Sequence, residues 1–455
     1  MQKLSLFFLA VCWILASQVE SNANEKPNIL VIMVDDLGYG DSSSYGATDL
    51  KTPSIDSIVE DGVKFTDFYA NCPVCSPSRA SFLSGRYPEL VGVPGVIRTY
   101  PQDNWGYLKK DIVTIGHKLQ EGGYSTALIG KWHLGLTSEH WPTNRGFDYF
   151  HGWLGDMMDD YYQHERHGIN YMRHNQDPIY PKGHATDLFT QWGCNYLDQQ
   201  AQSSKPFFLF LSYNAPHTPI QPPQDWLDKV RKRSPEMPEK RARLVALIEH
   251  MDHAIGLILG RLKKNNQSKN TLVVFTSDNG GQLNVGGRNG GFRDGKQSMY
   301  EGGIRVNTAF RWPSEIEPGS VTNQRGLTMD LYPTICEIAG VKINHEIDGV
   351  SLAPVLLGES LNNYERDLYF HRREGNQRYQ GFITNALIRG DWKLVNNSPF
   401  EPLELYNLHE DPYEKNNLAQ ENPAKFNELS KSLRVQIQRG GSVPWQSPVR
   451  REVKP

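Results

Sequence analysis

Cysteine is scarce in this chain, with five residues in a total of 455. Cys12 lies in an apolar stretch near the N-terminus, and the others are Cys72, Cys75, Cys194 and Cys336. So few cysteines exclude a small scaffold held together by disulfide bonds. A chain of this length can bury a large hydrophobic core instead. We therefore expect either several domains or one large α/β domain with an appendage.

Net charge is also nearly absent. Lys and Arg total 48 and Asp and Glu total 51, which gives a net charge of −3. This balance offers no electrostatic basis for binding nucleic acid or an anionic membrane surface. The hydrophobic fraction of 38% and the charged fraction of 22% are typical of a folded globular protein, and they exclude wholesale disorder.

The N-terminal apolar stretch follows Lys3 and covers residues 4–16. It is too short to span a bilayer. Small and polar residues follow it, as in a secretory signal peptide. We predict that residues 1–23 are a signal peptide, that the protein is periplasmic or secreted, and that it has no stable membrane insertion.

Four continuous apolar runs end in polar residues. The runs cover residues 29–34, 125–129, 207–211 and 272–276, and the polar residues that follow them include Asp35, Asp36, Lys131, His133, His217, Asp278 and Asn279. Apolar runs without alternation are typical of strands buried on both faces. Because ligands bind outside the carboxyl ends of strands in open α/β sheets, we expect these polar clusters to meet at one edge of one sheet.

Segments with helical periodicity separate the apolar runs. Residues 242–262 carry apolar side chains at i, i+3, i+4 spacing, which predicts an amphipathic helix packed on the sheet. Shorter helices are expected over residues 51–61, 78–85, 110–121 and 185–201. The class is therefore α/β.

The pattern changes after about residue 355. Short strand-like pieces at residues 368–371, 381–389 and 392–395 alternate with turns, and a helix is expected over residues 423–438. These features predict a small C-terminal part with short strands and one helix. Residues 440–455 are rich in proline and basic side chains, and we expect them to be poorly ordered or to lie over the surface.

Two of the polar clusters form an all-oxygen set of Asp35, Asp36, Asp278 and Asn279. Calcium and magnesium take oxygen ligands, whereas zinc sites favour histidine and cysteine. A single acidic pair is more often a helix cap or a solvated turn. Two pairs at two strand ends instead predict a hard-cation site.

Residues 75–86 read CSPSRASFLSGR, with Cys75, Pro77, Ser78 and Arg79 at the start and Leu83-Ser84-Gly85 near the end. This segment resembles the signature of the type I sulfatases, a formylglycine-dependent family of the alkaline phosphatase superfamily. The family usually has Thr where Ser84 stands. The alternative interpretation is a structural cysteine in a loop before a helix, because short motifs also occur by chance.

The resemblance implies that Cys75 is oxidised to formylglycine by a maturation enzyme. One hydroxyl of the aldehyde hydrate would attack sulfur to give a covalent sulfoenzyme intermediate, and the other would later expel the sulfate. Pro77 is expected to fix a turn, and Arg79 to place a cation beside the developing alkoxide. With Cys75 converted, three thiols remain after the leader, so at most one intramolecular disulfide could form.

The resemblance continues from about residue 26 to residue 418 and implies further roles. Lys131 and His133 lie in a GKWHLG segment, His217 in APHTP, and Lys296 in a segment that runs to Arg305. Lys131 would contact formylglycine and sulfate, and His133 would be the base that releases sulfate. His217 and Lys296 would bind sulfate oxygens, and the sequence leaves open which of them protonates the leaving alcohol.

The family's metal is one calcium ion, with magnesium less favoured. The resemblance assigns it to Asp35, Asp36, Asp278 and Asn279 together with the formylglycine derived from Cys75. Asp278 would also be placed to accept the proton of the attacking hydroxyl. Glu301 and Arg305 are expected to form a buried structural pair.

The resemblance also implies the fold and its division into two parts. The catalytic domain at residues 24–355 would have a large, mixed, mostly parallel sheet sandwiched by helices, as in alkaline phosphatase. The C-terminal subdomain at residues 356–455 would be a small α+β unit with an antiparallel sheet. The resemblance further implies hydrolysis of a sulfate ester, most often one on a carbohydrate. The alternatives are a phosphoester or phosphonate monoester hydrolase of the same superfamily, or a non-catalytic protein that binds sulfated glycans. Residues 151–175, which are rich in His, Tyr and Asp, are expected to line the substrate pocket rather than to hold a metal.

Overall fold

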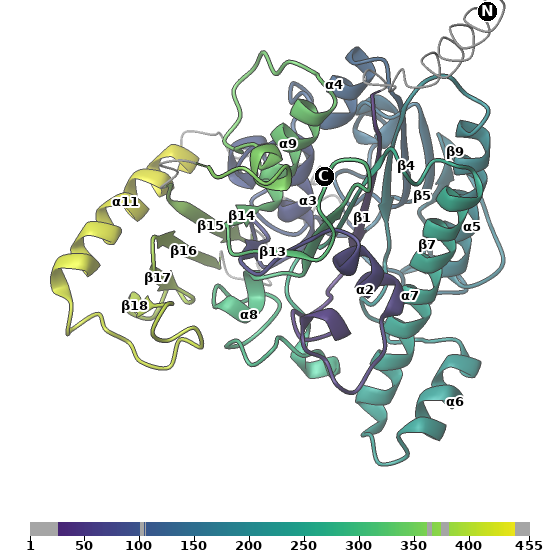
Figure 1. Cartoon of the computed structure of the whole chain (residues 1–455). Helices are drawn as coiled ribbons and strands as arrows, with labels where there is room; N and C mark the ends of the chain where they lie inside the picture. Colours follow the sequence, from purple (N-terminus) through teal and green to yellow (C-terminus); the bar gives the residue numbers. More distant parts are fainter. Residues whose placement is uncertain (1–25, 101–103, 105, 362–365, 375–381, 442–455) are drawn as a thin grey trace, which may run out of the picture.

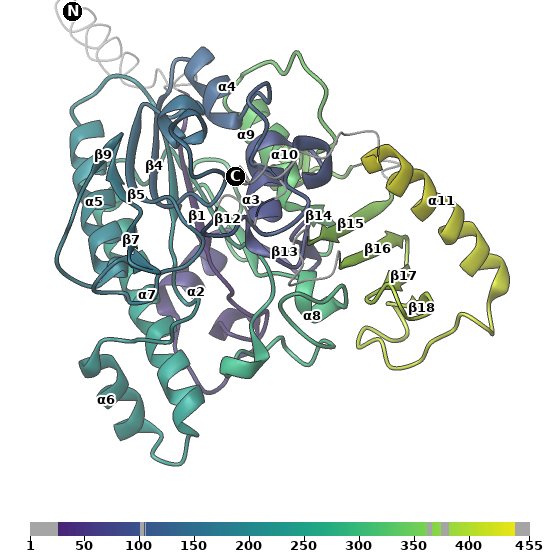
Figure 2. The same cartoon turned by 180° about the vertical axis from the view of Figure 1, so that it is seen from behind.

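A computed structural model describes residues 26–100, 104, 106–361, 366–374 and 382–441 (Figure 1). The predicted signal peptide with Cys12, and the tail beyond residue 441, lie outside the described residues. Among the helices of the described residues, none is both long enough and apolar enough to cross a membrane. A large sheet with its helices forms most of the molecule, and a smaller sheet with one long helix lies to one side (Figures 1 and 2).

Ten strands form the main sheet in the order β13-β2-β12-β11-β1-β10-β4-β5-β8-β9. The five central strands run parallel to one another: β11 (Thr271–Ser277), β1 (Asn28–Val34), β10 (Phe207–Ser212), β4 (Ser125–Lys131) and β5 (Tyr149–Trp153). Four of them are the predicted apolar runs, which lie next to one another in the sheet. The prediction of a mixed, mostly parallel sheet is therefore confirmed.

The outer strands make the sheet mixed. On one side lie β12 (Thr308–Arg311), β2 (Val63–Phe65) and β13 (Ser320–Thr322), and on the other β8 (Met172–His174) and β9 (Asp177–Pro178). The strand β12 is antiparallel to both β11 and β2, and β8 is antiparallel to both β5 and β9. Two short ladders complete the strands of this part, β3 (Phe68–Tyr69) with β14 (Gly326–Leu327) and β6 (Glu165–Arg166) with β7 (Ile169–Asn170).

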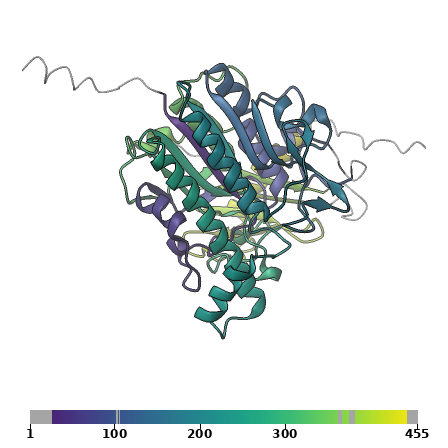
Figure 3. The same cartoon turned by 90° about the vertical axis from the view of Figure 1, so that its right-hand side faces the viewer.

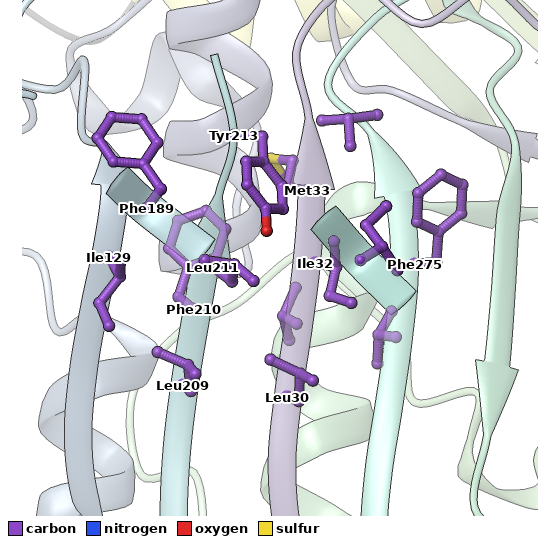
Figure 4. Close-up of a cluster of buried hydrophobic side chains, with 14 of the residues drawn as sticks. Leu30, Ile32, Met33, Ile129, Phe189, Leu209, Phe210, Leu211, Tyr213 and Phe275 are labelled. Carbon is purple, nitrogen blue, oxygen red and sulfur yellow. The ribbon is translucent and has the colours of Figure 1, made fainter. Parts of the chain in front are cut away.

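The centre of the sheet is apolar because its middle strand is buried on both faces. Leu30 of β1 pairs with Leu209 on one side and Val273 on the other, and none of the three is exposed beyond 1%. Figure 4 shows Leu30 and Ile32 among side chains from the neighbouring strands, including Leu209 and Phe275. Burial on both faces explains why the sequence shows continuous apolar runs and no alternation.

Helices cover both faces of the sheet. The long helices α5 (Ala185–Gln200) and α7 (Glu239–Lys264) pack side by side, and α7 also contacts α2 (Pro53–Glu60) and α6 (Gln224–Arg233) (Figure 3). A second group packs together and consists of α3 (Cys75–Ser84), α4 (Ile115–Glu121), α9 (Leu331–Ile338) and α10 (Ala353–Leu356). Short 3-10 turns lie at Ser43–Tyr45, Pro88–Val91, Ser138–His140, Pro142–Asn144, Leu283–Val285 and Thr328–Asp330, and α8 covers Glu301–Ile304.

Two predicted helix starts were wrong. Helix α4 begins at Ile115 instead of residue 110, because Thr114 caps it and accepts a hydrogen bond from the His117 N–H. Helix α3 begins at Cys75 instead of residue 78. Pro77 therefore lies in the first helical turn, where its missing N–H costs no hydrogen bond, and it does not form a separate turn as predicted.

The C-terminal sheet is antiparallel, as predicted. Its strands follow chain order as β15 (Leu368–Arg373), β16 (Ile383–Arg389), β17 (Trp392–Asn396) and β18 (Glu404–Asn407), and α11 (Pro423–Gly441) packs against β16 and β17. Its hydrophobic core also takes in Tyr69, Tyr87 and Met299 from the preceding part of the chain. The smaller sheet is therefore packed onto the larger unit.

Candidate active site

The carboxyl ends of the central strands bring the predicted polar residues together. Asp35 and Asp36 follow β1 directly, Asp278 follows β11, and Lys131 ends β4. Lys131 Nζ lies 2.5 Å from Asp35 Oδ2, and both side chains are fully buried. Residues separated by 96 positions in the chain thus form an ion pair at one sheet edge.

Cys75 is the first residue of α3 and is 3% exposed. Burial raises the pKa of its thiol to about 11, although the positive charges of Lys131 and Lys296 oppose the shift. An unmodified thiol at this position is therefore protonated at neutral pH and is a poor nucleophile. Its sulfur forms one close group with carboxylate oxygens of Asp35 and Asp278, all within 4.8 Å of one another.

The remaining three cysteines of the described residues, Cys72, Cys194 and Cys336, are also free and buried. No disulfide joins any cysteine in this part of the chain. The single disulfide that the sequence allowed is therefore not formed there.

Arg79 stabilises the acidic cluster through hydrogen bonds to Asp278. Its Nε and Nη2 both donate to Asp278 Oδ2, at 2.9 and 2.7 Å, and Nη1 donates to the Ser212 hydroxyl. The side chain is fully buried, and it is not among the residues that line the neighbouring pocket. Arg79 therefore holds Asp278 in place and balances its charge, and its guanidinium also interacts electrostatically with Cys75. The predicted role of Arg79 as a cation beside the reacting group stays a prediction.

The acidic cluster has the donors that a hard cation needs. Asp35 Oδ1 and Asn279 Oδ1 are buried oxygens without a hydrogen-bond partner. Asn279 Nδ2 donates to Asp36 Oδ1 at 2.8 Å, and the Asp36 N–H donates to Asp278 Oδ1 at 3.3 Å. Unsatisfied carboxylate and amide oxygens beside Cys75 match the ligand preference of Ca²⁺.

The carboxylates differ in their affinity for protons. Burial would raise the pKa of Asp35, but Lys131 and other nearby cations outweigh it and hold this pKa well below its usual range. Burial and the negative charge of Asp35 raise the pKa of Asp278 to about 7, against the opposing effect of Arg79. A bound cation would relieve the repulsion between these two carboxylates.

His133 presents a free imidazole nitrogen. Its Nε2–H donates to the Ile97 carbonyl at 2.7 Å, and its Nδ1 is buried without a hydrogen-bond partner. Burial and the charge of Lys131 hold the pKa of His133 well below its ordinary value, so the ring is neutral at pH 7. His133 therefore has a lone pair on Nδ1 that can accept a proton.

His217 and Lys296 form a second pair. Lys296 Nζ lies 3.0 Å from His217 Nε2 and 2.7 Å from Asp36 Oδ2. The Nδ1–H of His217 donates to the Thr218 carbonyl at 2.7 Å, so Nε2 accepts from Lys296. Burial and Lys296 lower the pKa of His217, while Asp36 raises the pKa of Lys296 against the effect of burial.

The loop that carries Lys296 is held by the C-terminal sheet. The Met299 N–H donates to Asn397 Oδ1 at 2.7 Å. Lys393 of β17 is fully buried and lies 2.9 Å from Glu301 and 2.8 Å from Glu414. The predicted pairing of Glu301 with Arg305 is present at 3.3 Å. Sequence reasoning missed Lys393 and Glu414, because no local pattern links them to the site.

A pocket of about 190 Å³ opens beside Cys75. Its lining includes His133, His217, Lys296 and a set of further residues: Val74, Val96, Arg98, Asp156, Met157, Arg166, Thr218, Gln282, Gln297 and Arg372. Asp156, Met157 and Arg166 come from the segment at residues 151–175 that was expected to line a pocket. Among the described residues, no group of three metal-ligating side chains includes a residue of that segment.

Comparison with known proteins gives the family. The family model described as Sulfatase matches residues 27–341, which is more than half of the chain. The chain belongs to the sulfatase family. A second model, described as N-sulphoglucosamine sulphohydrolase, C-terminal, matches residues 289–441 of this sulfatase.

Individual relatives agree with this membership. The sulfatase is 33% identical to N-acetylgalactosamine-6-sulfatase of Canis lupus familiaris over 374 residues, which cover 77% of this chain and 70% of the relative. It is 27% identical to human steryl-sulfatase, over 94% of this chain and 89% of that protein. The solved structure of Ps i-CgsB in complex with k-i-k-neocarrahexaose has a TM-score of 0.83 at 31% identity and covers 93% of this chain and 94% of its own.

Membership decides between the alternatives that the sequence left open. This sulfatase is an enzyme that hydrolyses sulfate esters. The non-catalytic binding protein and the phosphoester hydrolase are therefore no longer the favoured interpretations.

Proposed function

We propose that this sulfatase removes sulfate from a sulfated saccharide, with formylglycine at position 75 and one Ca²⁺ bound at the acidic cluster. The saccharide assignment rests on the polar side chains that line the pocket. Thr218, Gln282 and Gln297 offer neutral hydrogen-bonding groups, and charged residues line the same pocket. Such groups match sugar hydroxyls, whereas a flat apolar ring system would leave them unpaired.

Stacking of a sugar ring would need aromatic side chains in the pocket wall. Apart from two histidines, the lining of the pocket contains no aromatic side chain within the described residues. Recognition is therefore assigned to hydrogen bonds and charge instead of stacking.

The names of relatives support the same class. N-acetylgalactosamine-6-sulfatase carries a sugar in its name. The solved structure of Ps i-CgsB contains an oligosaccharide, and both proteins are above 30% identity to this chain. Steryl-sulfatase is the less similar of these relatives by identity.

Ca²⁺ would be held by Asp35, Asp36, Asp278 and Asn279, and it would supply positive charge to orient the sulfate. Formylglycine hydrate at position 75 would supply the attacking hydroxyl, which a buried, protonated thiol cannot replace. Lys131 places a fixed positive charge on Asp35 beside position 75.

His133 and Lys296 then divide the proton transfers. His133 Nδ1 accepts a proton when sulfate is released, because it is the unpartnered nitrogen of a neutral ring in the pocket wall. Lys296 holds the proton that the leaving alcohol needs, since His217 accepts a hydrogen bond from it.

We also propose the cellular setting that follows from the sequence. The protein would be exported through the leader at residues 1–23 and matured by a formylglycine-generating enzyme. The catalytic domain would span residues 24–355, and the C-terminal subdomain residues 356–455.

The test is sulfate release from a panel of sulfated monosaccharides and disaccharides, with aryl sulfate and aryl phosphate esters beside them. We expect the highest kcat/KM on a sulfated saccharide. A higher kcat/KM on the aryl phosphate, or release of sulfate from the aryl ester alone, would contradict the proposal.

A further inference from the structure

Arg372 lies in the pocket wall and shares its carboxylate partner with a second arginine. Glu374, which is 2% exposed, accepts from Arg372 Nε at 3.0 Å through Oε1 and from Arg98 Nη2 at 2.9 Å through Oε2. Arginine stays protonated at all physiological pH values. One negative charge on Glu374 therefore faces two guanidinium groups.

The remaining contacts of Arg372 leave part of its guanidinium available. Nη1 donates to the Gln297 carbonyl at 2.9 Å, next to Lys296. Within the described residues, no hydrogen bond is made by Nη2. The side chain is 4% exposed and lines the same pocket as Cys75. A buried guanidinium with an unused N–H pair is suited to a sulfate or a carboxylate, because its fork matches two oxygens of such a group.

Arg166, another residue of the pocket lining, has the reverse charge balance. Arg166 Nη1 lies 2.6 Å from Asp159 Oδ1, and its Nε lies 3.5 Å from Asp156 Oδ1. Two carboxylates therefore surround this single guanidinium. This difference in local charge favours Arg372 over Arg166 as the partner of an incoming anion.

We propose that Arg372 binds a second anionic group of the substrate, a sulfate or a carboxylate on the sulfated sugar or its neighbour. The substrate is then a saccharide with at least two negative charges, of which only one is on the group that is hydrolysed. This inference rests on the proposed saccharide substrate and narrows it to a class.

The first experiment compares matched substrates on the wild-type enzyme. The first pairs compare the monosulfate with the disulfate of galactose, and likewise of N-acetylgalactosamine. The second pairs compare each monosulfated sugar alone with the same sugar linked to a uronic acid. We expect kcat/KM to be about tenfold higher, or more, for the doubly charged member of at least one pair, since a charge-assisted hydrogen bond is among the strong ones. The pair that shows the effect identifies the second group as sulfate or carboxylate.

The second experiment uses Arg372→Gln and Arg372→Lys. We expect Arg372→Gln to remove most of the preference for the doubly charged member, and Arg372→Lys to keep part of it, because lysine retains the charge and lacks the fork. If Arg372 acted only by holding Gln297 and the Lys296 loop, both members of a pair would lose activity equally. The matched control is Arg231→Gln on α6, an exposed arginine outside the pocket lining that pairs with Glu239, and it should leave the preference near its wild-type value.

The outcomes separate this inference from the proposed function. Desulfation of saccharides with equal kcat/KM for both members of every pair would overturn the inference and leave the saccharide assignment standing. If the Arg372 variants lost the same factor in kcat/KM on both substrates of a pair, the inference would also be overturned. Sulfate release from aryl esters and from no saccharide would contradict the saccharide assignment, and the inference would be overturned with it.

Discussion

Lys296 donates a hydrogen bond to His217 Nε2 across 3.0 Å, and the same ammonium group lies 2.7 Å from Asp36. The histidine is therefore the acceptor of this pair, and its other nitrogen is already used by the Thr218 carbonyl. Asp36 raises the pKa of Lys296, and burial with Lys296 lowers the pKa of His217. The pair thus carries one positive charge, and that charge resides on Lys296.

This assignment predicts how Lys296→Met depends on the leaving group. Without the proton donor, aryl sulfates with poorly acidic leaving groups should slow by about 10²–10⁴-fold, and those with strongly acidic leaving groups should slow far less. The measurement is the slope of log kcat against leaving-group pKa. His217→Ala is the comparison variant, and it should steepen this slope less than Lys296→Met does. A loss in Lys296→Met that is the same for all leaving groups would show that Lys296 only binds the sulfate.

The acidic cluster predicts a dependence on calcium. Asp278→Asn or Asp35→Asn should weaken calcium binding and remove activity that added calcium partly restores, because each removes a charged oxygen ligand. Zinc should not substitute. Binding is measured by calorimetry and elemental analysis, and Asp228→Asn on the exposed face of α6 serves as the control. Full activity after exhaustive chelation, with no metal detected in the protein, would reject the site.

His133 is predicted to act only in the second half of the reaction. In His133→Ala the ester should be cleaved about once per active site and turnover should then nearly stop, since the base for sulfate release is missing. Rapid-quench measurement of the released alcohol should show a burst equal to the enzyme concentration. On an ester with a poorly acidic leaving group, Lys296→Met should show no burst, because the first step then lacks its proton donor. Equal loss of the burst in both variants would contradict this division of roles.

Glu89 makes stability depend on pH. It is 7% exposed, and burial raises its pKa from about 4.5 to about 8. The folded state then holds this proton more tightly than the unfolded state. The contribution of protonated Glu89 to the free energy of unfolding is complete below pH 4.5, and it is lost as pH rises toward 8.

Glu89→Gln should therefore reduce the fall in stability between pH 5 and pH 8, by an amount on the order of a few kcal/mol at the alkaline end. Urea unfolding of both proteins at several pH values measures this. The exposed Glu317→Gln is the control, and its unfolding curve should follow the wild type. Parallel curves for Glu89→Gln and wild type would show that Glu89 is not buried as described.

The central strands were predictable because a strand buried on both faces appears in the sequence as a continuous apolar run. The apolar run before Asp35 became β1, and the run before Asp278 became its neighbour β11. The polar residues at their ends met because parallel strands share one carboxyl edge. The start of α3 was missed because proline at residue 77 suggested a turn, although the first helical turn tolerates it.

Other parts of the site depend on contacts that no local pattern records. Lys393 reaches Glu301 from a strand 92 residues away. The neutral state of His133 and the direction of the bond between Lys296 and His217 depend on burial and on which carbonyl each ring faces. These features arise from tertiary packing, and only the structure shows them.

The most direct test of the whole account is the mass of the peptide that contains Cys75, taken from enzyme with measured sulfatase activity. The account predicts loss of the thiol and the mass of the aldehyde or its hydrate, in a fraction that rises in proportion to activity. Cys75→Ala, prepared in parallel, should fold like the wild type and show no turnover. An intact Cys75 thiol in fully active enzyme, or a Cys75→Ala variant within about tenfold of wild-type activity, would contradict the account.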